Sequence, residues 1–142
     1  MLLPDVNILI YATRRDAPRH SAYRAWLDDL VRGPAAFAMS ELVLSGFIRV
    51  MTLPKTFATP TSTDQVARVV DEIIRRPHCQ LLRPGARHLG IFLDLCTTLE
   101  LRGNAVPDAY HAALAIESGS EWVTADRGFG RFPGLRWRHP LD

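Results

Sequence analysis

Four acidic residues stand at positions typical of a shared metal site, although they are spread over most of the chain. Three of them, Asp5, Glu41 and Asp126, each follow a short apolar run typical of a strand. Asp108 follows Pro107 and opens an alanine-rich segment typical of a helix start. In a parallel α/β sheet all strands end at the same edge, where the returning helices begin and ligands bind. We therefore expect the four carboxylates to meet at that edge.

Each acid also has a structural explanation. Asp and Glu favour the first turn of a helix, where they cap free N–H groups and face the positive end of the helix dipole. That explanation is the better one for any single acid. Several converging carboxylates, however, repel one another unless a cation lies between them. An all-oxygen set without paired histidines or cysteines selects Mg²⁺, with Mn²⁺ as a substitute, rather than zinc.

A carboxylate site of this kind predicts hydrolysis of nucleic acid. Bound Mg²⁺ ions hold a phosphodiester, lower the pKa of a water molecule and stabilise the departing oxygen. Asn7, Ser40 and Thr124 lie within two residues of an acid, and their side chains can position a carboxylate or the attacking water. His111 stands three residues after Asp108; it either orients that carboxylate or is a buried structural residue, which helical periodicity favours.

Arginine dominates the basic residues, because Lys55 is the single lysine among 17 Lys and Arg, while the net charge is only +2. The planar guanidinium suits phosphate recognition, although nucleotide bias in a GC-rich genome also explains the ratio. Clusters of arginine indicate a polyanionic partner. Arg127 and Arg131, which follow Asp126, are the candidates for contacting the substrate.

The length of 142 residues and the 47% hydrophobic content fit a single domain, 1–142. The first residues have no basic segment before the apolar part, so no signal peptide is expected. No apolar run is long enough to cross a bilayer, and we expect a cytoplasmic protein without a membrane partner. Cys79 and Cys96 form no CxxC motif and are expected as small core residues.

Alternation of strands and helices predicts a three-layer α/β fold around a parallel sheet. The expected strands cover residues 2–4, 36–40, 79–82, 122–124 and, as a last short strand, 135–137. The expected helices cover residues 7–12, 21–31, 42–51, 64–76, 88–101 and 108 to about 119. Residues 54–63, with two prolines, are expected as a surface loop.

Four short motifs follow one another along the chain. They are Asp-x-Asn at residues 5–7, Ser-Glu at 40–41, Asp-Ala-x-x-Ala-Ala at 108–113 and Thr-x-Asp-x-x-Phe at 124–129. In type, order and spacing they resemble those of the PIN-domain ribonucleases, and within that family those of the VapC-type toxins of bacterial toxin-antitoxin systems. The resemblance covers nearly the full chain. It implies a PIN-like fold with about five parallel strands, a Mg²⁺-dependent endoribonuclease with the four acids as its acidic quartet, a homodimer, and neutralisation by a cognate antitoxin.

Three alternatives stay open. A PIN nuclease of RNA maturation, outside a toxin system, would have the same site. A catalytically silent RNA-binding or protein-pairing module would have the same fold, but it would have no reason to keep carboxylates that repel one another. Phosphoaspartate enzymes also place an aspartate after the first strand, but they need a lysine at a later strand end, whereas Lys55 lies in a loop flanked by proline.

Overall fold

The central sheet takes its strands from both ends of the chain. The computed structural model describes residues 1–142. Five parallel strands pair in the order β3-β2-β1-β4-β5. They are β1 (Leu2–Pro4), β2 (Phe37–Ser40), β3 (Cys79–Leu82), β4 (Glu121–Val123) and β5 (Trp137–Arg138). Pro4 pairs with Val123, so β1 and β4 end side by side and the residues that follow them begin at one point.

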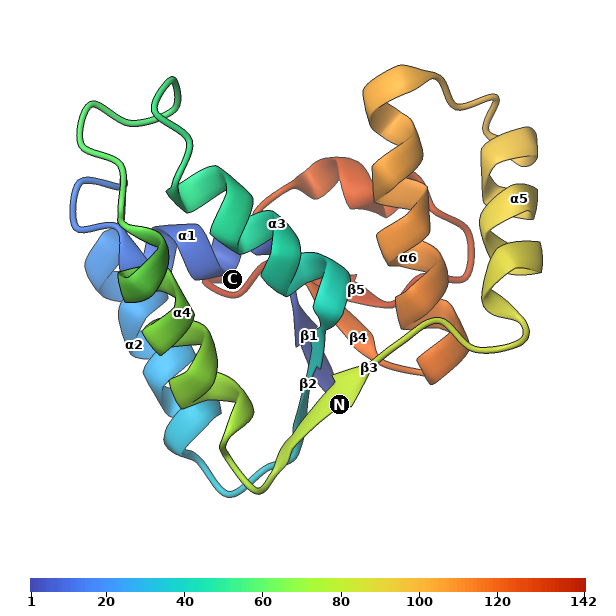
Figure 1. Ribbon diagram of the computed structural model, residues 1–142. Coiled ribbons are helices and arrows are strands. Elements are labelled where there is room, and N and C mark those ends of the chain that lie inside the picture. Colours follow the sequence, from blue (N-terminus) through green and yellow to red (C-terminus); the bar gives the residue numbers. More distant parts are fainter.

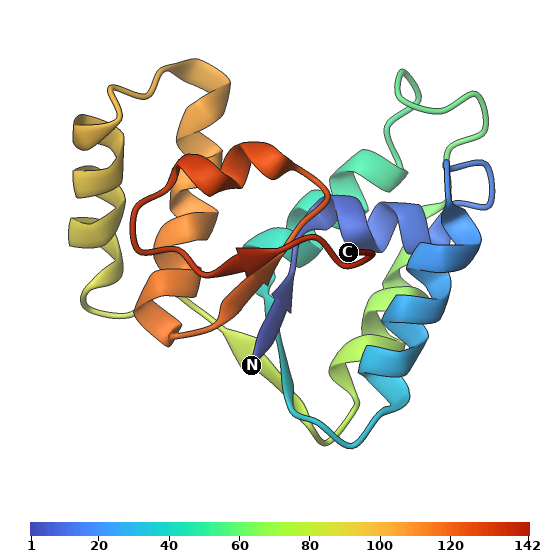
Figure 2. The same cartoon turned by 180° about the vertical axis from the view of Figure 1, so that it is seen from behind.

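Helices cover the sheet on both sides. They are α1 (Val6–Thr13), α2 (His20–Arg32), α3 (Glu41–Met51), α4 (Thr63–Ile74), α5 (His88–Thr98) and α6 (Val106–Ser118). Figure 1 shows α2 and α4 on one side of the sheet and α5 and α6 on the other, and Figure 2 shows the same layers from behind. The expected three-layer α/β fold is confirmed. No helix has the length and apolarity that a membrane span requires.

Local sequence signals set the helix ends. The hydroxyl oxygen of Ser40 accepts hydrogen bonds from the first free N–H groups of α3. Ser62 and Gln65 form a reciprocal capping box at the start of α4. Pro107 stands in the first turn of α6, and Gly119 ends that helix in the left-handed conformation, with φ of 68°.

Four segments differ clearly from the sequence-based expectation. Helix α5 stops at Thr98 instead of residue 101, because Glu100 adopts a positive φ of 50° and the N–H of Leu101 turns back to the carbonyl of Cys96. The last strand is Trp137–Arg138, since pairing with β4 decides its register. Residues 103–105 and 127–131 form short 3-10 helices that periodicity does not reveal.

The core lies between the sheet and the two helical layers. The fully buried strand residues are Leu3, Phe37, Ala38, Met39, Trp122 and Val123. Both cysteines are free and half-buried, and their side chains pack against this core. Burial of the apolar strands on both faces is what fixes their ends at one edge of the sheet.

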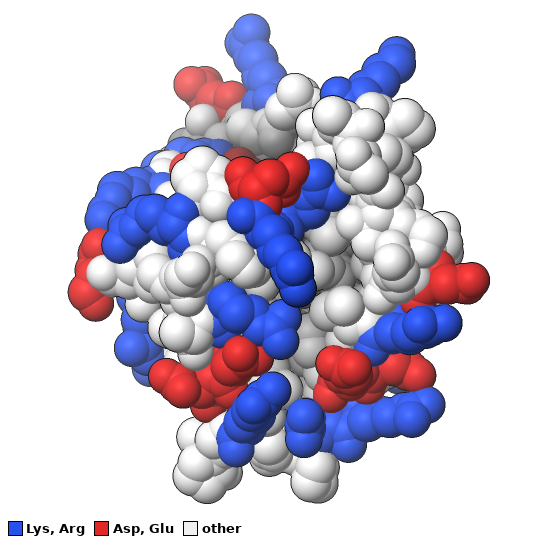
Figure 3. All heavy atoms as spheres, turned by 90° about the vertical axis from the view of Figure 1, so that its left-hand side faces the viewer, with Lys and Arg blue, Asp and Glu red and all other residues white.

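Charge is mixed on the face formed by α2 and α4. Figure 3 shows basic and acidic side chains interleaved there rather than a field of one sign. Within each helix, arginine and aspartate pair one turn apart, as in Arg24–Asp28 at 3.0 Å and Arg75–Asp71 at 2.8 Å. This face is therefore a poor candidate for a polyanion-binding surface.

Candidate active site

Asp5 is the buried member of the acidic set, with 7% of its surface exposed. It follows β1 and caps α1, because its Oδ1 accepts a hydrogen bond of 2.6 Å from the N–H of Val6. Its Oδ2 accepts hydrogen bonds from the Thr124 hydroxyl at 2.6 Å and from the Asn7 side-chain amide at 3.0 Å. Both carboxylate oxygens are thus held in a fixed orientation.

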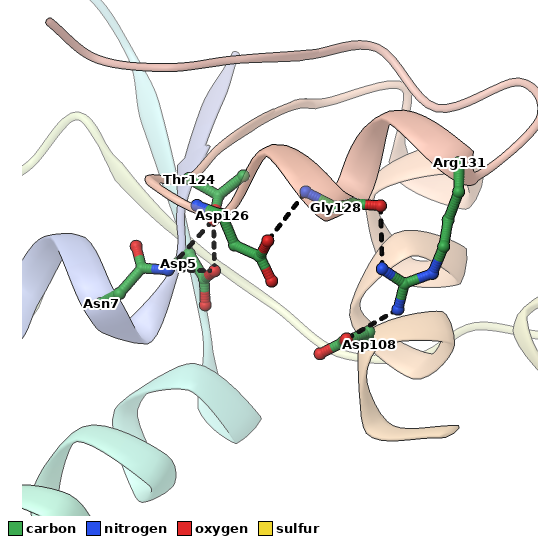
Figure 4. Close-up of polar contacts among 7 residues, drawn as sticks. All are labelled: Asp5, Asn7, Asp108, Thr124, Asp126, Gly128 and Arg131. Carbon is green, nitrogen blue, oxygen red and sulfur yellow. Dashed lines mark hydrogen bonds and ion pairs between the residues drawn. The ribbon is translucent and has the colours of Figure 1, made fainter. Parts of the chain in front are cut away.

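Thr124 and Asn7 connect the ends of β1 and β4. While the Thr124 hydroxyl donates to Asp5, its oxygen accepts from the Asn7 amide at 3.1 Å and from the N–H of Asp126 at 3.0 Å. The side-chain oxygen of Asn7 accepts from the N–H of Ala125 at 3.2 Å. Figure 4 shows these side chains converging on Asp5. The structure therefore places both residues where they can position carboxylates.

A chain of three hydrogen bonds connects Asp126 to Asp108. Asp126 Oδ1 accepts from the N–H of Gly128 at 2.8 Å, and the carbonyl of Gly128 accepts from Arg131 Nη1 at 2.8 Å. Arg131 Nη2 in turn donates to Asp108 Oδ2 at 2.9 Å (Figure 4). A Cβ at position 128 would lie 2.8 Å from Arg131 Nη1 and 2.9 Å from Asp126 Oδ1. A side chain at position 128 would therefore force the Arg131 guanidinium and the Asp126 carboxylate to shift.

The electrostatics of Asp5 indicate a deficit of positive charge. The pKa of this carboxyl is raised to about 6, chiefly by burial and to a smaller extent by the negative charges of Asp108 and Asp126, while the hydrogen bonds from Thr124 and Val6 lower it. A cation next to Asp5 would offset both causes. Carboxylate oxygens are also the donors that hard divalent cations prefer, so these residues fit such an ion.

Glu41 lies apart from the other three acids. It is the first residue of α3, its Oε1 accepts from Arg83 Nη2 at 2.6 Å, and this hydrogen bond lowers the pKa of the Glu41 carboxyl. Glu41 lines a hollow together with Ile48 and Leu81, and Asp5 lines a different hollow. The hydroxyl of Ser40, which was expected to position a carboxylate, caps α3.

The four carboxylates are consequently not assembled as the sequence suggested. No group of three or more histidine, cysteine, aspartate or glutamate side chains is gathered closely enough to hold a metal ion. The physical reason is visible in the ion pairs, because Arg83 holds Glu41 and Arg131 holds Asp108. Guanidinium groups satisfy two of the carboxylates in this arrangement.

His111 lines the same cleft as Asp5 and Asp108, a hollow of about 340 Å³ that also includes Arg49 of α3. Its ring stacks on Trp122, with ring centroids 5.2 Å apart, and burial lowers its pKa to about 4. Its Nδ1 is buried without a partner. It makes no hydrogen bond to Asp108, and the packing role favoured by periodicity describes it better.

Two functional candidates were missed in the sequence. Gly128 follows Asp126 by two residues, and an Asp-x-Gly turn after a strand could have drawn attention to it. Arg49 lies two helical turns after Glu41 on α3, a spacing that places both on one face of the helix. Nothing in the local sequence indicates that Arg49 borders the cleft.

Comparisons with known proteins agree with this architecture. A PIN domain model matches residues 2–135. VapC ribonuclease Mb2897 of Mycobacterium bovis is 44% identical over 142 residues, which cover 100% of this chain and 97% of that protein. Ribonuclease VapC33 of Mycobacterium tuberculosis is 35% identical over 141 residues, which cover 99% of each.

Solved structures share the fold. VapBC2 from Rickettsia felis, bound to a DNA fragment from its promoter, matches with a TM-score of 0.72 at 22% identity and 97% coverage of each chain. Mycobacterium tuberculosis VapC20, a toxin that cleaves the sarcin-ricin loop, matches with a TM-score of 0.67 at 16% identity, covering 96% of this chain and 99% of that one. Family match, identity and fold agree, and the chain belongs to the PIN domain family, among the VapC ribonucleases.

Proposed function

We propose that this protein is an endoribonuclease that hydrolyses RNA phosphodiester bonds at a divalent-metal site, which Asp5, Asp108 and Asp126 form when Asp108 releases Arg131 and a bound ion draws the three carboxylates together. The observation that carries the proposal is the buried Asp5 carboxyl, whose pKa is raised to about 6 by burial and by the two neighbouring carboxylates. A bound cation would stabilise the negative charge of Asp5, which its surroundings otherwise oppose. The relatives that are named ribonucleases support the same reaction.

VapC-type PIN nucleases are generally dependent on a divalent metal. For this chain we infer Mg²⁺, with Mn²⁺ as a substitute, since the donors are carboxylate oxygens. A bound ion would lower the pKa of a water molecule and stabilise the departing oxygen. Thr124 and Asn7 keep Asp5 in one orientation, and the N–H of Gly128 does the same for Asp126.

Glu41 is inferred to be the fourth acid of the site, but it must leave Arg83 to act there. The Arg83–Glu41 pair is exposed, with 70% of the Arg83 side chain and 51% of the Glu41 side chain accessible. Breaking this ion pair therefore requires little free energy. Ser40 supports this role indirectly, because its hydroxyl fixes the start of α3 and thereby the position of Glu41.

Arg131 is the stronger candidate for contacting RNA phosphate. Its guanidinium lies beside Asp108, whereas that of Arg127 pairs with Asp142 at 2.8 Å on the exposed surface. Arginine at the cleft would bind the phosphate that the carboxylates hydrolyse.

We further infer that the protein is a homodimeric cytoplasmic toxin that a cognate antitoxin neutralises. Its VapC-named relatives and the structural neighbours described as toxin-antitoxin complexes support the antitoxin partner, whereas the homodimer and the cytoplasmic location are inferred from the family resemblance alone. A PIN nuclease of RNA maturation is the second candidate. Co-purification of this chain with the small product of the adjacent open reading frame would favour the toxin, and loss of toxicity on co-expression would support neutralisation.

RNA cleavage with and without Mg²⁺ tests the proposed reaction. The substitutions Asp5→Asn and Asp108→Asn are expected to abolish cleavage, and excess EDTA should do the same. Asp71→Asn is a matched control for Asp108→Asn, because Asp71 also pairs with an arginine but lies on α4, far along the chain from the site. Cleavage by both site variants at the rate of the unmodified protein, or undiminished cleavage in EDTA, would overturn the proposal.

A further inference from the structure

Arg131 is held beside Asp108 by three separate contacts. Its Nη2 donates to Asp108 Oδ2 at 2.9 Å, its Nη1 donates to the carbonyl of Gly128 at 2.8 Å, and its Cζ lies 4.6 Å from the centre of the Phe132 ring. The side chains of Arg131 and Asp108 are 35% and 30% exposed. By contrast, Arg83 beside Glu41 is 70% exposed. The position of the Arg131 guanidinium is therefore set by its surroundings.

The backbone of residues 127–131 is shaped for this contact. Gly128 binds Asp126 through its N–H and Arg131 through its carbonyl, and a side chain at position 128 would displace the ends of both partner side chains. One short 3-10 helix thus links two carboxylates of the site, one through a backbone N–H and the other through a guanidinium.

The charge of Arg131 offsets the repulsion within the site. Asp5 and Asp108 line the same cleft, and Thr124 joins Asp126 to Asp5, so the metal-free site holds excess negative charge. A guanidinium bound to Asp108 reduces this excess. It also occupies Asp108 Oδ2, so this oxygen would be available to a divalent cation only after the guanidinium has left.

We propose that Arg131 is an exchangeable counter-ion of Asp108 that competes with the divalent cation for this carboxylate. The inference rests on the proposed metal-dependent function and adds a positioning residue to it, since Arg131 acts through Asp108. The pair is partly exposed, so the exchange is cheap and reversible. On release the guanidinium stays tethered within reach of the cleft, where it can meet a phosphate.

Binding of Mn²⁺ to the protein without RNA, followed by electron paramagnetic resonance, tests this competition. Arg131→Gln is expected to bind Mn²⁺ about two- to fivefold more tightly than the unmodified chain, the range that loss of a partly exposed ion pair allows. Damage to the fold would weaken binding instead of tightening it. Arg127→Gln is the matched control. Arg127 carries the same charge, lies four residues before Arg131 and pairs with Asp142, so its replacement should leave the Mn²⁺ affinity unchanged.

Each result has a defined meaning. Equal Mn²⁺ affinity of Arg131→Gln and the unmodified chain would overturn the competition, and equal tightening by Arg127→Gln would replace it with a long-range charge effect. Arg131→Met, which keeps an extended side chain over Phe132, takes the place of Arg131→Gln if that variant does not fold. Absence of Mn²⁺ binding to the unmodified chain would instead overturn the proposed metal-dependent function, and the inference with it.

Discussion

The Thr124 hydroxyl donates a 2.6 Å hydrogen bond to Asp5 Oδ2 and so joins residues that are 119 positions apart in the sequence. The contact follows from the sheet, because Pro4 and Val123 are partners in neighbouring strands and the N–H of Asp5 bonds to the carbonyl of Val123 at 2.9 Å. Thr124 is fully buried. The junction of β1 and β4 is thus the rigid centre of the site, and the acids paired with arginine surround it.

Replacing Thr124 by valine removes this hydroxyl while it keeps the shape of the side chain. Asp5 then loses a donor and the N–H of Asp126 loses an acceptor, so we expect RNA cleavage to fall by about 10- to 100-fold. The free energy of unfolding should fall by about 1–3 kcal/mol, as for buried polar groups left unpaired. Thr124→Ser retains the hydroxyl and is expected to recover most of both quantities. A valine variant as active as the serine variant would contradict the positioning role.

Asp5→Asn is expected to remove activity and, in the metal-free protein, to remove the pH-dependent cost of ionising Asp5. The raised pKa of about 6, against an ordinary value of 3.8, means that ionisation of Asp5 opposes folding above pH 6 and that this cost disappears as the pH falls toward 4. Two pKa units correspond to roughly 3 kcal/mol, and the amide avoids this cost. In EDTA, the gain in free energy of unfolding over the unmodified chain should therefore be larger at neutral pH than near pH 4.

Denaturant unfolding at the two pH values measures this difference. His111, whose pKa burial lowers to about 4, opposes the trend in the unmodified chain, because its protonation destabilises the fold as the pH falls. The comparison of Asp5→Asn with the unmodified chain cancels this effect, since both contain His111. A gain that does not change with pH would show that the carboxyl is not destabilising.

The fold and the rigid centre of the site could be predicted, because both follow from local patterns. Short apolar runs ending in Asp5 and Thr124 identify strand ends, and parallel strands place their ends together. The Arg83–Glu41 and Arg131–Asp108 pairs could not be predicted. Arg83 follows β3 and Arg131 ends a 3-10 helix, so pairing between strands sets the position of neither arginine. The 3-10 helix at residues 127–131 depends on close contacts of Gly128 that hydrophobic periodicity does not encode.

Glu41→Gln distinguishes a carboxylate inside the metal site from one outside it. In this structure Glu41 is exposed and paired with Arg83, so its neutralisation should leave the melting temperature unchanged. If Glu41 leaves Arg83 and joins the site, as inferred above, RNA cleavage at saturating Mg²⁺ should fall by about 10- to 100-fold. Cleavage at the rate of the unmodified chain would place Glu41 outside the metal site.

Arg131 and Arg127 are expected to differ in their effect on RNA binding, although both follow Asp126 closely. Arg131 pairs with Asp108, which lines the cleft, whereas Arg127 is held on the exposed surface by Asp142. Arg131→Gln should weaken binding of a short RNA and reduce the dependence of log K on log salt concentration by about one counterion. The equivalent change at Arg127 should leave the slope as it is. Fluorescence anisotropy across a salt series in excess EDTA, where cleavage stops and all four acids are kept, measures both slopes without a contribution from metal binding. Equal slopes for both arginine variants would remove Arg131 from the RNA interface.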